Sequence, residues 1–412
     1  MSEQQKSLLV IGGGAAGFFC AVNAARLNPA LKVVIVEKSN KVLSKVKVSG
    51  GGRCNVTHDC FDIDELSKKY PRGEKFLRKA FHWFNVQDTI NWFKERGVEL
   101  KTESDGRMFA TTNTSQTIID CLIKEANTYK VELLMSSGVK AIVANENGFE
   151  VALESGNKMI ANYVCIACGG FPKQSQFDWL QQLEHSIESP VPSLFTFNIP
   201  NNKIVDLMGV SVEQAQIKVT GTKLQSSGAL LITHWGLSGP AVLKLSAFAA
   251  RELANKNYDF EIVVNWLPKF NEQSLQQEFQ LLRQKISTQK LYSKNVFGLP
   301  NRLWEYLLQI SSINSEMRWA DLPGKQTNIL IKNLCNQSFN VKGKTTFKEE
   351  FVTCGGIKLN EVDVNTMQSK KQPNLFFAGE VLDIDGITGG FNFQNAWTTG
   401  WIAAKAIATP KI

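Results

Sequence analysis

Residues 7–17 read Ser-Leu-Leu-Val-Ile-Gly-Gly-Gly-Ala-Ala-Gly, and this stretch decides the fold. The apolar run 7–11 predicts a buried parallel strand, and residues 15–27 predict an Ala-rich helix that ends before Asn28-Pro29. Between them the glycines follow the pattern G-x-G-x-x-G, with Gly12, Gly14 and Gly17 at its fixed positions. In such a loop the first glycine makes the turn, the second admits a pyrophosphate, and the third lets the helix pack on the strand. Residues 32–37 predict the next strand and complete one βαβ unit.

An acidic residue at the end of this second strand strengthens the nucleotide pattern. Glu37 stands 20 residues after Gly17, where a carboxylate accepts hydrogen bonds from ribose hydroxyls. An acid at this position disfavours a 2′-phosphate on the bound nucleotide, so the adenosine is that of FAD or NAD. The alternative is a structural glycine turn, which would explain neither the flanking strands nor the acid.

A second glycine-rich run near the other end of the chain favours FAD over NAD. Residues 379–394 read Gly-Glu-Val-Leu-Asp-Ile-Asp-Gly-Ile-Thr-Gly-Gly-Phe-Asn-Phe-Gln and follow the apolar strand 374–378. We expect Glu380 to contact the ribityl hydroxyls or the pyrophosphate. We expect a helix over 392–407 to direct its N-terminus at the flavin edge that becomes negative on reduction. A strand–turn–helix with capping glycines is the structural alternative.

A glycine triplet forms the third unusual element. Residues 49–55 read Ser-Gly-Gly-Gly-Arg-Cys-Asn. Three consecutive glycines lose much conformational entropy on folding, which indicates that another group approaches the backbone closely. Arg53 beside them would suit a phosphate or an electron-rich ring. A flexible surface loop is the alternative interpretation.

Composition indicates an ordinary globular protein of more than one domain. The chain has 412 residues, 43% hydrophobic and 20% charged, and no apolar stretch approaches the roughly 20 residues of a membrane span. The polar start lacks a secretory pattern, so we expect a cytoplasmic protein without a membrane partner. The net charge of +8 is scattered, and the basic runs 41–47 and 342–348 are short. They favour a solvated surface or a phosphate-binding rim over a nucleic-acid patch.

The cysteines predict neither a disulfide framework nor a redox pair. Eight cysteines are spread over the chain, and Cys165 and Cys168 form a C-x-x-C within an apolar run. Positions three apart on a strand point to opposite faces, so we expect buried strand cysteines. No metal site is predicted.

Further elements follow from periodicity. Helices are predicted over 74–96 and 116–130, and strands over 131–134, 139–145, 149–153 and 159–167. After Pro190-Val191-Pro192 the pattern changes to short alternating strands, then to Gln- and Leu-rich helical segments. We predict an α/β fold in which a discontinuous FAD-binding domain of 1–190 and 351–412 is interrupted by a β-barrel domain of 191–270 and 337–350. The barrel carries a helical insert of 271–336.

These motifs resemble the BaiN-like, or aminoacetone oxidase-like, family of FAD-dependent oxidoreductases. The resemblance covers nearly the whole chain. It rests on the two glycine motifs and the terminal run, and on Gly106-Arg107-Met108-Phe109, Thr233-His234-Trp235-Gly236-Leu237-Ser238-Gly239-Pro240, Thr353-Cys354-Gly355-Gly356 and Thr366-Met367-Gln368-Ser369-Lys370. It implies a Rossmann-type FAD domain of the glutathione-reductase kind, interrupted by a barrel with a helical insert. Family activities include oxidation of an aminoketone and reduction of a steroid enone. The chain departs from the family pattern in its short loop after Gly170 and in having Ala229 where an acid is usual.

Taken together, these observations define a candidate cofactor site. The predicted FAD-binding residues are Gly12, Gly14, Ala15, Ala16, Glu37, Lys38, Lys45, Gly51, Gly52, Arg53, Asn55, Val139, Gly169, Gly379, Glu380, Gly389, Gly390, Phe391 and Asn392.

The predicted activity is flavin-mediated hydride transfer. The hydride passes between NAD(P)H, or a small amine- or ketone-type substrate, and an acceptor such as O2 or an enone. No second glycine fingerprint exists, so NAD(P)H would bind only transiently. His234 is the candidate proton donor because histidine titrates near neutral pH, and a structural loop histidine is the alternative. The competing hypotheses are a flavin-dependent RNA-modifying protein and a redox-sensing binding protein with little turnover. The sequence shows no clustered basic and aromatic tract that would favour RNA.

Overall fold

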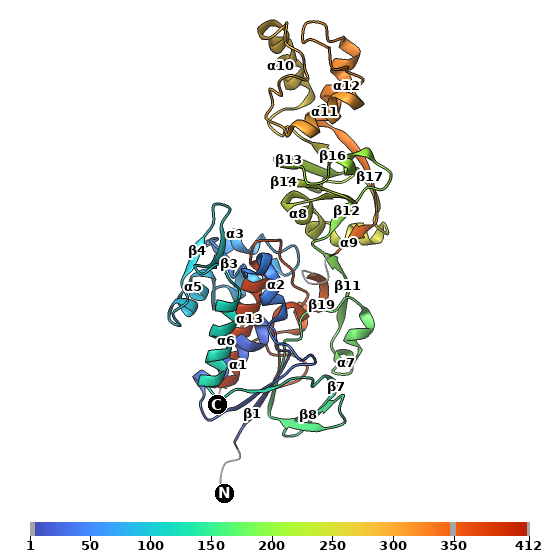
Figure 1. The fold of residues 1–412 in the computed structure, drawn as a ribbon. Coiled ribbons are helices and arrows are strands. Elements are labelled where there is room, and N and C mark those ends of the chain that lie inside the picture. Colours follow the sequence, from blue (N-terminus) through green and yellow to red (C-terminus); the bar gives the residue numbers. More distant parts are fainter. Residues whose placement is uncertain (1–4, 347–351, 410–412) are drawn as a thin grey trace. The chain divides into compact units, whose positions relative to one another are not determined.

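The computed structural model describes residues 5–346 and 352–409 and divides into two compact units. Unit 1 comprises Met1–Ser193 and Phe347–Ile412, and unit 2 comprises Leu194–Thr346 (Figure 1). Residues 347–351, where the sequence places the return to the first domain, lie outside the described part. The finer three-part division stays a prediction.

Unit 1 is built on a parallel sheet, which confirms the predicted Rossmann-type α/β fold. Its strand order is β20-β10-β1-β2-β6, and all neighbours that pair are parallel. Strand residues at the centre are wholly buried, as expected of a sheet covered on both faces. The strands are β1 (Ser7–Ile11), β2 (Lys32–Val36), β6 (Glu132–Leu134), β10 (Tyr163–Ile166) and β20 (Leu375–Phe377).

Two long helices from opposite ends of the chain pack together beside this sheet. Helix α1 spans Ala15–Leu27, as predicted, and α13 spans Phe391–Ala408, one residue longer at each end than predicted. They lie side by side (Figure 1), with the rings of Phe19 and Trp397 5.2 Å apart. The Phe19 ring also lies 4.6 Å from Trp92 of α5 (Val86–Lys94). This aromatic core fixes the start of the chain against its end.

The predicted helix over 74–96 is two helices, α4 (Glu74–Ala80) and α5. The break has a local cause: Asn85 accepts from the backbone N–H groups of Gln87 and Asp88, and Asp88 accepts from Asn85 N at 2.8 Å. This capping box starts a new helix. The predicted strand 159–167 is also divided, at Asn162, whose Oδ1 accepts from Ser7 N at 2.8 Å.

The remaining elements of unit 1 are short. They include three small sheets, with orders β3-β5-β4, β7-β8-β9 and β11-β19. The strands are β3 (Thr57–His58), β4 (Leu100–Thr102), β5 (Arg107–Ala110), β7 (Val139–Asn145), β8 (Gly148–Leu153), β9 (Lys158–Ala161), β11 (Ile187–Ser193) and β19 (Val352–Ile357). The helices are α2 (Ser44–Gly52), α3 (Ile63–Ser67), α6 (Gln116–Thr128) and α7 (Asp178–Gln181), with 3-10 turns at Gln174–Phe177, Leu359–Glu361 and Gly379–Val381.

Unit 2 is an antiparallel sheet that closes on itself. Its order is β17-β16-β13-β14-β15-β12-β18, and the two end strands are consecutive in the chain, separated only by Gly343. Gly343 N donates to Tyr258 O at 2.8 Å on one side, and Gly343 O accepts from Asn198 N at 3.3 Å on the other. The strands are β12 (Thr196–Asn198), β13 (Ser211–Val219), β14 (Gln225–Thr233), β15 (Gly236–Ser238), β16 (Asp259–Asn265), β17 (Gln337–Lys342) and β18 (Lys344–Thr345).

Helices complete unit 2 and share one apolar core with the sheet, which includes Phe197, Trp266 and Trp304. The Gln- and Leu-rich segment forms helices, as its apolar spacing predicts. The helices are α8 (Pro240–Phe248), α9 (Ala250–Asn255), α10 (Glu272–Lys285), α11 (Asn301–Ile310) and α12 (Gly324–Cys335), with a 3-10 turn at Lys203–Leu207. No helix in the described ranges is both long and apolar enough to span a bilayer.

Candidate flavin site

The first glycine loop has the geometry of a dinucleotide cradle. A Cβ on Gly17 would lie 1.9 Å from Gly12 O, so only glycine lets α1 pack on the loop. A Cβ on Gly14, by contrast, would meet no heavy atom within 4 Å. Gly14 is the N-cap of α1 and no side chain caps the helix there. The backbone N–H groups of Ala15 and Ala16 in the first turn therefore suit a phosphate.

Glu37 holds this loop in place. One carboxylate oxygen accepts from Gly13 N and the other from Ser39 N, each at 2.8 Å. Each oxygen keeps a second lone pair, so the predicted contact with ribose hydroxyls stays compatible with these bonds. Lys38 is exposed, with its Nζ 5.6 Å from the Phe171 ring centroid.

Two other predicted residues flank the same loop. Ser137 N donates to Glu37 O at 2.8 Å, which brings the start of β7 and Val139 to the edge of the sheet where Glu37 stands. Gly169 follows β10 with a φ of +79°, and a Cβ there would meet nothing within 4 Å. Both positions therefore border the candidate nucleotide site.

The glycine triplet adopts a left-handed backbone. Gly50, Gly51 and Gly52 have φ values of +59°, +68° and +81°. Gly51 and Gly52 are exposed, with open space where a Cβ would stand. The guanidinium of Arg53 lies 2.5 Å from Glu103 and over the Phe109 ring, 4.1 Å from its centroid. Arg53 thus stacks on an electron-rich ring of the protein itself.

The segment after the triplet is tied to the terminal run. With its amide oxygen turned toward Gly390, Asn55 accepts from Gly390 N at 3.0 Å and donates to Thr57 O at 2.9 Å. Thr57 Oγ1 donates to Gln394 Oε1 at 2.6 Å, and Trp397 Nε1 donates to Val56 O at 2.9 Å. Residues 55–57, which follow the triplet, are therefore tied to the start of α13.

An ion pair joins the predicted residues Lys45 and Glu380. Lys45 Nζ lies 2.7 Å from Glu380 Oε2, and Glu380 Oε1 accepts from Thr353 N at 2.9 Å. A Cβ on Gly379 would lie 2.8 Å from the Cβ of Ala16. The structure thus brings together groups that the sequence places at opposite ends of the chain.

The turn at Gly389 and Gly390 opens α13, with φ values of +123° and +94°. Gly390 is the N-cap, and no side chain caps the helix there. Asn392 exchanges two hydrogen bonds with the backbone of Gly386, at 2.8 and 3.0 Å. The Phe391 ring is buried against His58, 4.7 Å away. The Phe391 and Asn392 side chains therefore shape the turn, and their contact with a cofactor stays a prediction.

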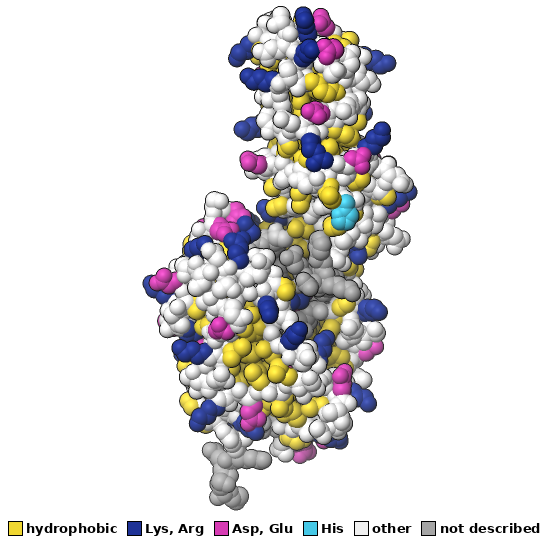
Figure 2. Space-filling model, in the orientation of Figure 1, with side chains coloured by type: hydrophobic (Ala, Val, Ile, Leu, Met, Phe, Trp, Pro, Cys, Tyr) yellow, Lys and Arg dark blue, Asp and Glu magenta, His cyan; other side chains and the backbone are white. Residues whose placement is uncertain are grey.

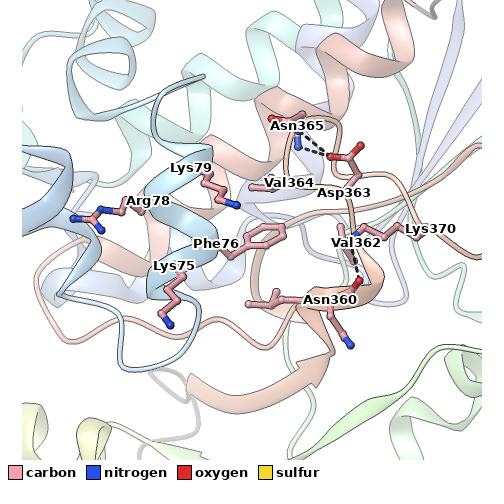
Figure 3. Close-up of a pocket in the computed structure, with 11 residues that line it drawn as sticks. Lys75, Phe76, Arg78, Lys79, Asn360, Val362, Asp363, Val364, Asn365 and Lys370 are labelled. Carbon is pink, nitrogen blue, oxygen red and sulfur yellow. Dashed lines mark hydrogen bonds between the residues drawn. The ribbon is translucent and has the colours of Figure 1, made fainter.

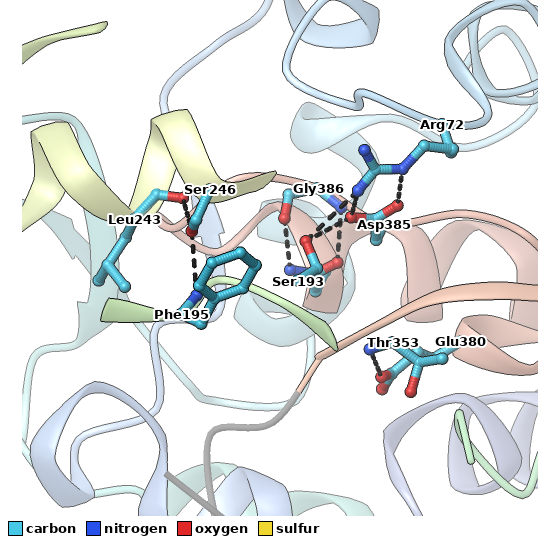
Figure 4. A network of polar contacts seen from close by, with 10 residues as sticks. Arg72, Ser193, Phe195, Leu243, Ser246, Thr353, Glu380, Asp385 and Gly386 are labelled. Carbon is cyan, nitrogen blue, oxygen red and sulfur yellow. Dashed lines mark hydrogen bonds and ion pairs between the residues drawn. The ribbon is translucent and has the colours of Figure 1, made fainter. Parts of the chain in front are cut away.

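A buried polar network supports the terminal run and was missed by the sequence analysis. The Asp385 carboxylate is wholly buried, accepts from Ser193 Oγ at 2.7 Å and forms an ion pair with Arg72 (Figure 4). Burial raises the pKa of Asp385, and the charge of Arg72 opposes this shift. Arg72 and Asp385 are 313 residues apart, so no spacing rule links them.

The two histidines of interest differ in environment. His58 Nδ1 lies 3.0 Å from Gly389 O, so it carries the proton, because a carbonyl oxygen only accepts. Burial lowers the pKa of His58. His234 is exposed between β14 and β15 of unit 2, with its ring 4.1 Å from Trp235. A catalytic role for His234 stays a prediction.

Two buried polar atoms lack a hydrogen-bond partner among the described residues, Thr353 Oγ1 and Asn395 Oδ1. The backbone N–H of Thr353 donates to Glu380, and Asn395 lies in the second turn of α13. Such orphaned groups are rare in proteins and are often satisfied by a ligand or water. Together with the open space at Gly14, they fit a long polar cofactor.

The cysteines show no redox pair in the described ranges. Cys165 is wholly buried in β10, as predicted, but β10 ends at Ile166, so the prediction of a buried strand residue is wrong for Cys168, which is half-buried in the loop that follows. Burial raises the pKa of Cys168 to about 12, which keeps it a neutral thiol. No disulfide joins the eight cysteines.

Comparison with known proteins identifies the fold and its chemistry. A family profile described as "HI0933-like protein Rossmann domain" matches residues 6–406. The chain is 26% identical to a 3-dehydro-bile acid delta(4,6)-reductase of Clostridium scindens over 97% of this chain and 98% of that one. It is 29% identical to a ribosomal RNA dihydrouridine synthase of Escherichia coli over 98% of both chains.

Solved structures extend the fold comparison. The 3-ketosteroid delta1-dehydrogenase of Sterolibacterium denitrificans superimposes with a TM-score of 0.53 at 12% identity, covering 98% of this chain and all of the other. At this identity the likeness concerns the fold alone.

Proposed function

This chain belongs to the HI0933-like Rossmann family and is an FAD-dependent oxidoreductase, and we propose that it reduces a carbon–carbon double bond conjugated with a carbonyl group. The names of its relatives carry this proposal. A delta(4,6)-reductase of a 3-dehydro-bile acid and a dihydrouridine synthase both describe the addition of hydrogen to an alkene next to a carbonyl. The 5,6 double bond of uracil is conjugated with the C4 carbonyl, as an enone is.

The reaction needs a hydride at the β-carbon and a proton at the α-carbon. Bound FAD supplies hydride chemistry, and a reductant of the NAD(P)H class supplies the two electrons. The protein's part is to bind, to orient and to provide the proton. Gly14, the uncapped start of α1 and the Lys45–Glu380 pair suit the pyrophosphate and ribityl chain. The uncapped start of α13 suits the edge of the flavin that gains negative charge.

The proton donor we propose is His234. Its ring is exposed, and a histidine ring nitrogen is a common donor of the proton in general acid catalysis. In His234→Gln we expect kcat for alkene reduction to fall about 10²-fold or more, while flavin reduction by the nicotinamide donor is retained. An unchanged kcat would remove His234 from the reaction.

The proposed function is tested with the FAD-loaded protein under anaerobic conditions. The protein is mixed with NADPH and, in parallel, with a steroid enone, free uridine, a uridine-containing RNA or a small aminoketone. We expect a product with two added hydrogen atoms from at least one conjugated carbonyl compound. If no conjugated alkene is reduced and the aminoketone alone bleaches the flavin without NADPH, the chain is an oxidase and the proposal is wrong.

A further inference from the structure

A basic groove lies on unit 1 between α4 and the segment 359–365. It has a volume of about 690 Å³, and its walls come from parts of the chain about 290 residues apart (Figure 3). Lys75, Arg78 and Lys79 line it from α4, and Lys370 lines it from the other side. Asp363 is the acidic residue among its lining side chains, so cations outnumber carboxylates by four to one.

The available positive charge comes mainly from Lys75 and Lys79. Both are exposed on α4, four residues apart and hence on one face of the helix. Arg78 pairs with Asp64, and Lys370 Nζ donates to Asn360 O at 2.9 Å. The Asp363 carboxylate is held by Asn365, whose backbone N–H donates to it at 2.8 Å. Asp363 keeps its negative charge, and the four cations of the lining outnumber it.

Aromatic side chains accompany these charges. The Phe76 ring is half-buried and points from α4 toward Asn360 and Val362 (Figure 3). Asn365 accepts from Trp83 Nε1 at 3.2 Å, and the Trp83 ring carries Lys405 Nζ 5.0 Å from its centroid. Trp83 is 43% exposed, which leaves much of its surface available for contact. The groove thus continues into a second basic and aromatic position.

The groove borders the segment that closes the candidate flavin site. Gly73 is the N-cap of α4, and a Cβ there would lie 2.7 Å from Ile384. The preceding residue, Arg72, forms the buried ion pair with Asp385. A chain lying along α4 would therefore pass beside the run 379–394.

We propose that this groove binds the backbone of single-stranded RNA and so presents a uridine to the flavin. Positive charges along a groove with interleaved aromatic rings are the features that bind single strands, through phosphate contacts and base stacking. The inference rests on the proposed function and names its substrate class. The face in Figure 2 shows Lys and Arg dispersed among acidic side chains, so the local groove, more than the net charge of +8, carries the argument.

The test compares two double charge reversals in the FAD-loaded protein, Lys75→Glu/Lys79→Glu and a control, Lys325→Glu/Lys332→Glu. The control lysines are also exposed on a single helix, α12, so both variants change net charge equally. Binding of a fluorescent 20-nucleotide oligouridylate is measured by anisotropy over a range of salt concentrations. Each lost phosphate contact lowers the salt slope by about 0.7, which corresponds to about fourfold in affinity at about 0.15 M salt. We expect the groove variant to lose tenfold or more and the control to lose little.

Phe76→Leu separates stacking from charge, since it keeps an apolar side chain and removes the ring. We expect it to weaken oligouridylate about fivefold or more, with no change in salt slope or in the binding of inorganic polyphosphate. Circular dichroism and FAD content show whether each variant is folded.

Three results would overturn the proposal. They are equal RNA binding by the groove and control variants, no RNA binding by the wild-type protein, and slower flavin reduction by NADPH in the groove variant with RNA binding intact. The last result would assign the groove to a nicotinamide nucleotide. Failure of the proposed function looks different: RNA would bind in the groove, and no conjugated alkene would be reduced. If free uridine or an enone is reduced without RNA binding, the reaction class stands and this inference fails.

Discussion

Gly14 and Gly17 stand three residues apart in the same loop, and the structure assigns them opposite reasons for being glycine. A Cβ at Gly14 meets nothing within 4 Å, so the space is available to a ligand. In Gly14→Ala we expect the protein without FAD to lose no more than about 1 kcal/mol of stability, the cost of a poorer N-cap. The new methyl group would stand where the pyrophosphate approaches, so the Kd for FAD should rise at least about tenfold, or about 1.4 kcal/mol.

In Gly17→Ala we expect the main effect to be on the stability of the protein without FAD. The added Cβ would lie 1.9 Å from Gly12 O, a backbone atom that cannot swing away. Overpacking of this kind costs about 1–3 kcal/mol and occasionally more, against a gain in helix propensity of about 1 kcal/mol. Because the contact is with backbone, we expect a net loss of about 2 kcal/mol in the protein without FAD.

The assay is urea unfolding of the FAD-free variants, followed by FAD titration with flavin fluorescence as the signal. The two variants are matched controls, since each adds one methyl group to the same loop. The reasoning is refuted if Gly14→Ala binds FAD as tightly as the wild type, or if Gly17→Ala is as stable as the wild type without cofactor.

Other predictions test the surrounding structure. Arg72→Met leaves Asp385 buried without its cation and should lower the free energy of unfolding by about 3–5 kcal/mol. The double variant Arg72→Met/Asp385→Asn should recover part of this loss. Equal stability of the single and the double variant would contradict the account. Burial alone would raise the pKa of Glu361, but hydrogen bonds from Lys371 and Ser186 outweigh it and lower the pKa to about 2 from 4.5. A depressed pKa stabilises the fold above pH 4.5, so the stability advantage over Glu361→Gln in pH-dependent unfolding should shrink as the pH falls toward 2. We expect Cys168→Ser to keep full turnover, because the Cys168 thiol is neutral. Loss of activity in this variant would instead support the redox-pair interpretation.

The parts of the fold that are specified locally could be predicted from the sequence. Helix α1 was predicted at its observed bounds because a glycine loop precedes it and Asn28-Pro29 follows it. In unit 2, short runs of alternating residues predicted strands, and the structure has strands in this part of the chain. The division of 74–96 into two helices also has a local signal, Asn85 with Asp88, that periodicity alone does not register.

The contacts that join distant segments could not be predicted from spacing. Lys45 and Glu380 were each expected near the cofactor, but their ion pair joins residues 335 positions apart. Arg72 with Asp385, and the groove formed by α4 with 359–370, arise in the same way. Three of the four cations of the groove and its aromatic rings stand together in residues 75–83, where helical spacing was interpreted only as a helix, and Lys370 joins them when the chain folds.

The most direct test of the central claim is a single-turnover experiment. FAD-loaded protein is reduced anaerobically with one equivalent of NADPH or dithionite and mixed with a conjugated carbonyl compound, either a steroid enone or a uridine-containing RNA. The account predicts that the visible absorbance of oxidised flavin returns at the rate at which the saturated product forms, one product per flavin. If the flavin stays reduced with every conjugated alkene and is reoxidised only by O2, the claim that this chain is an alkene reductase is contradicted.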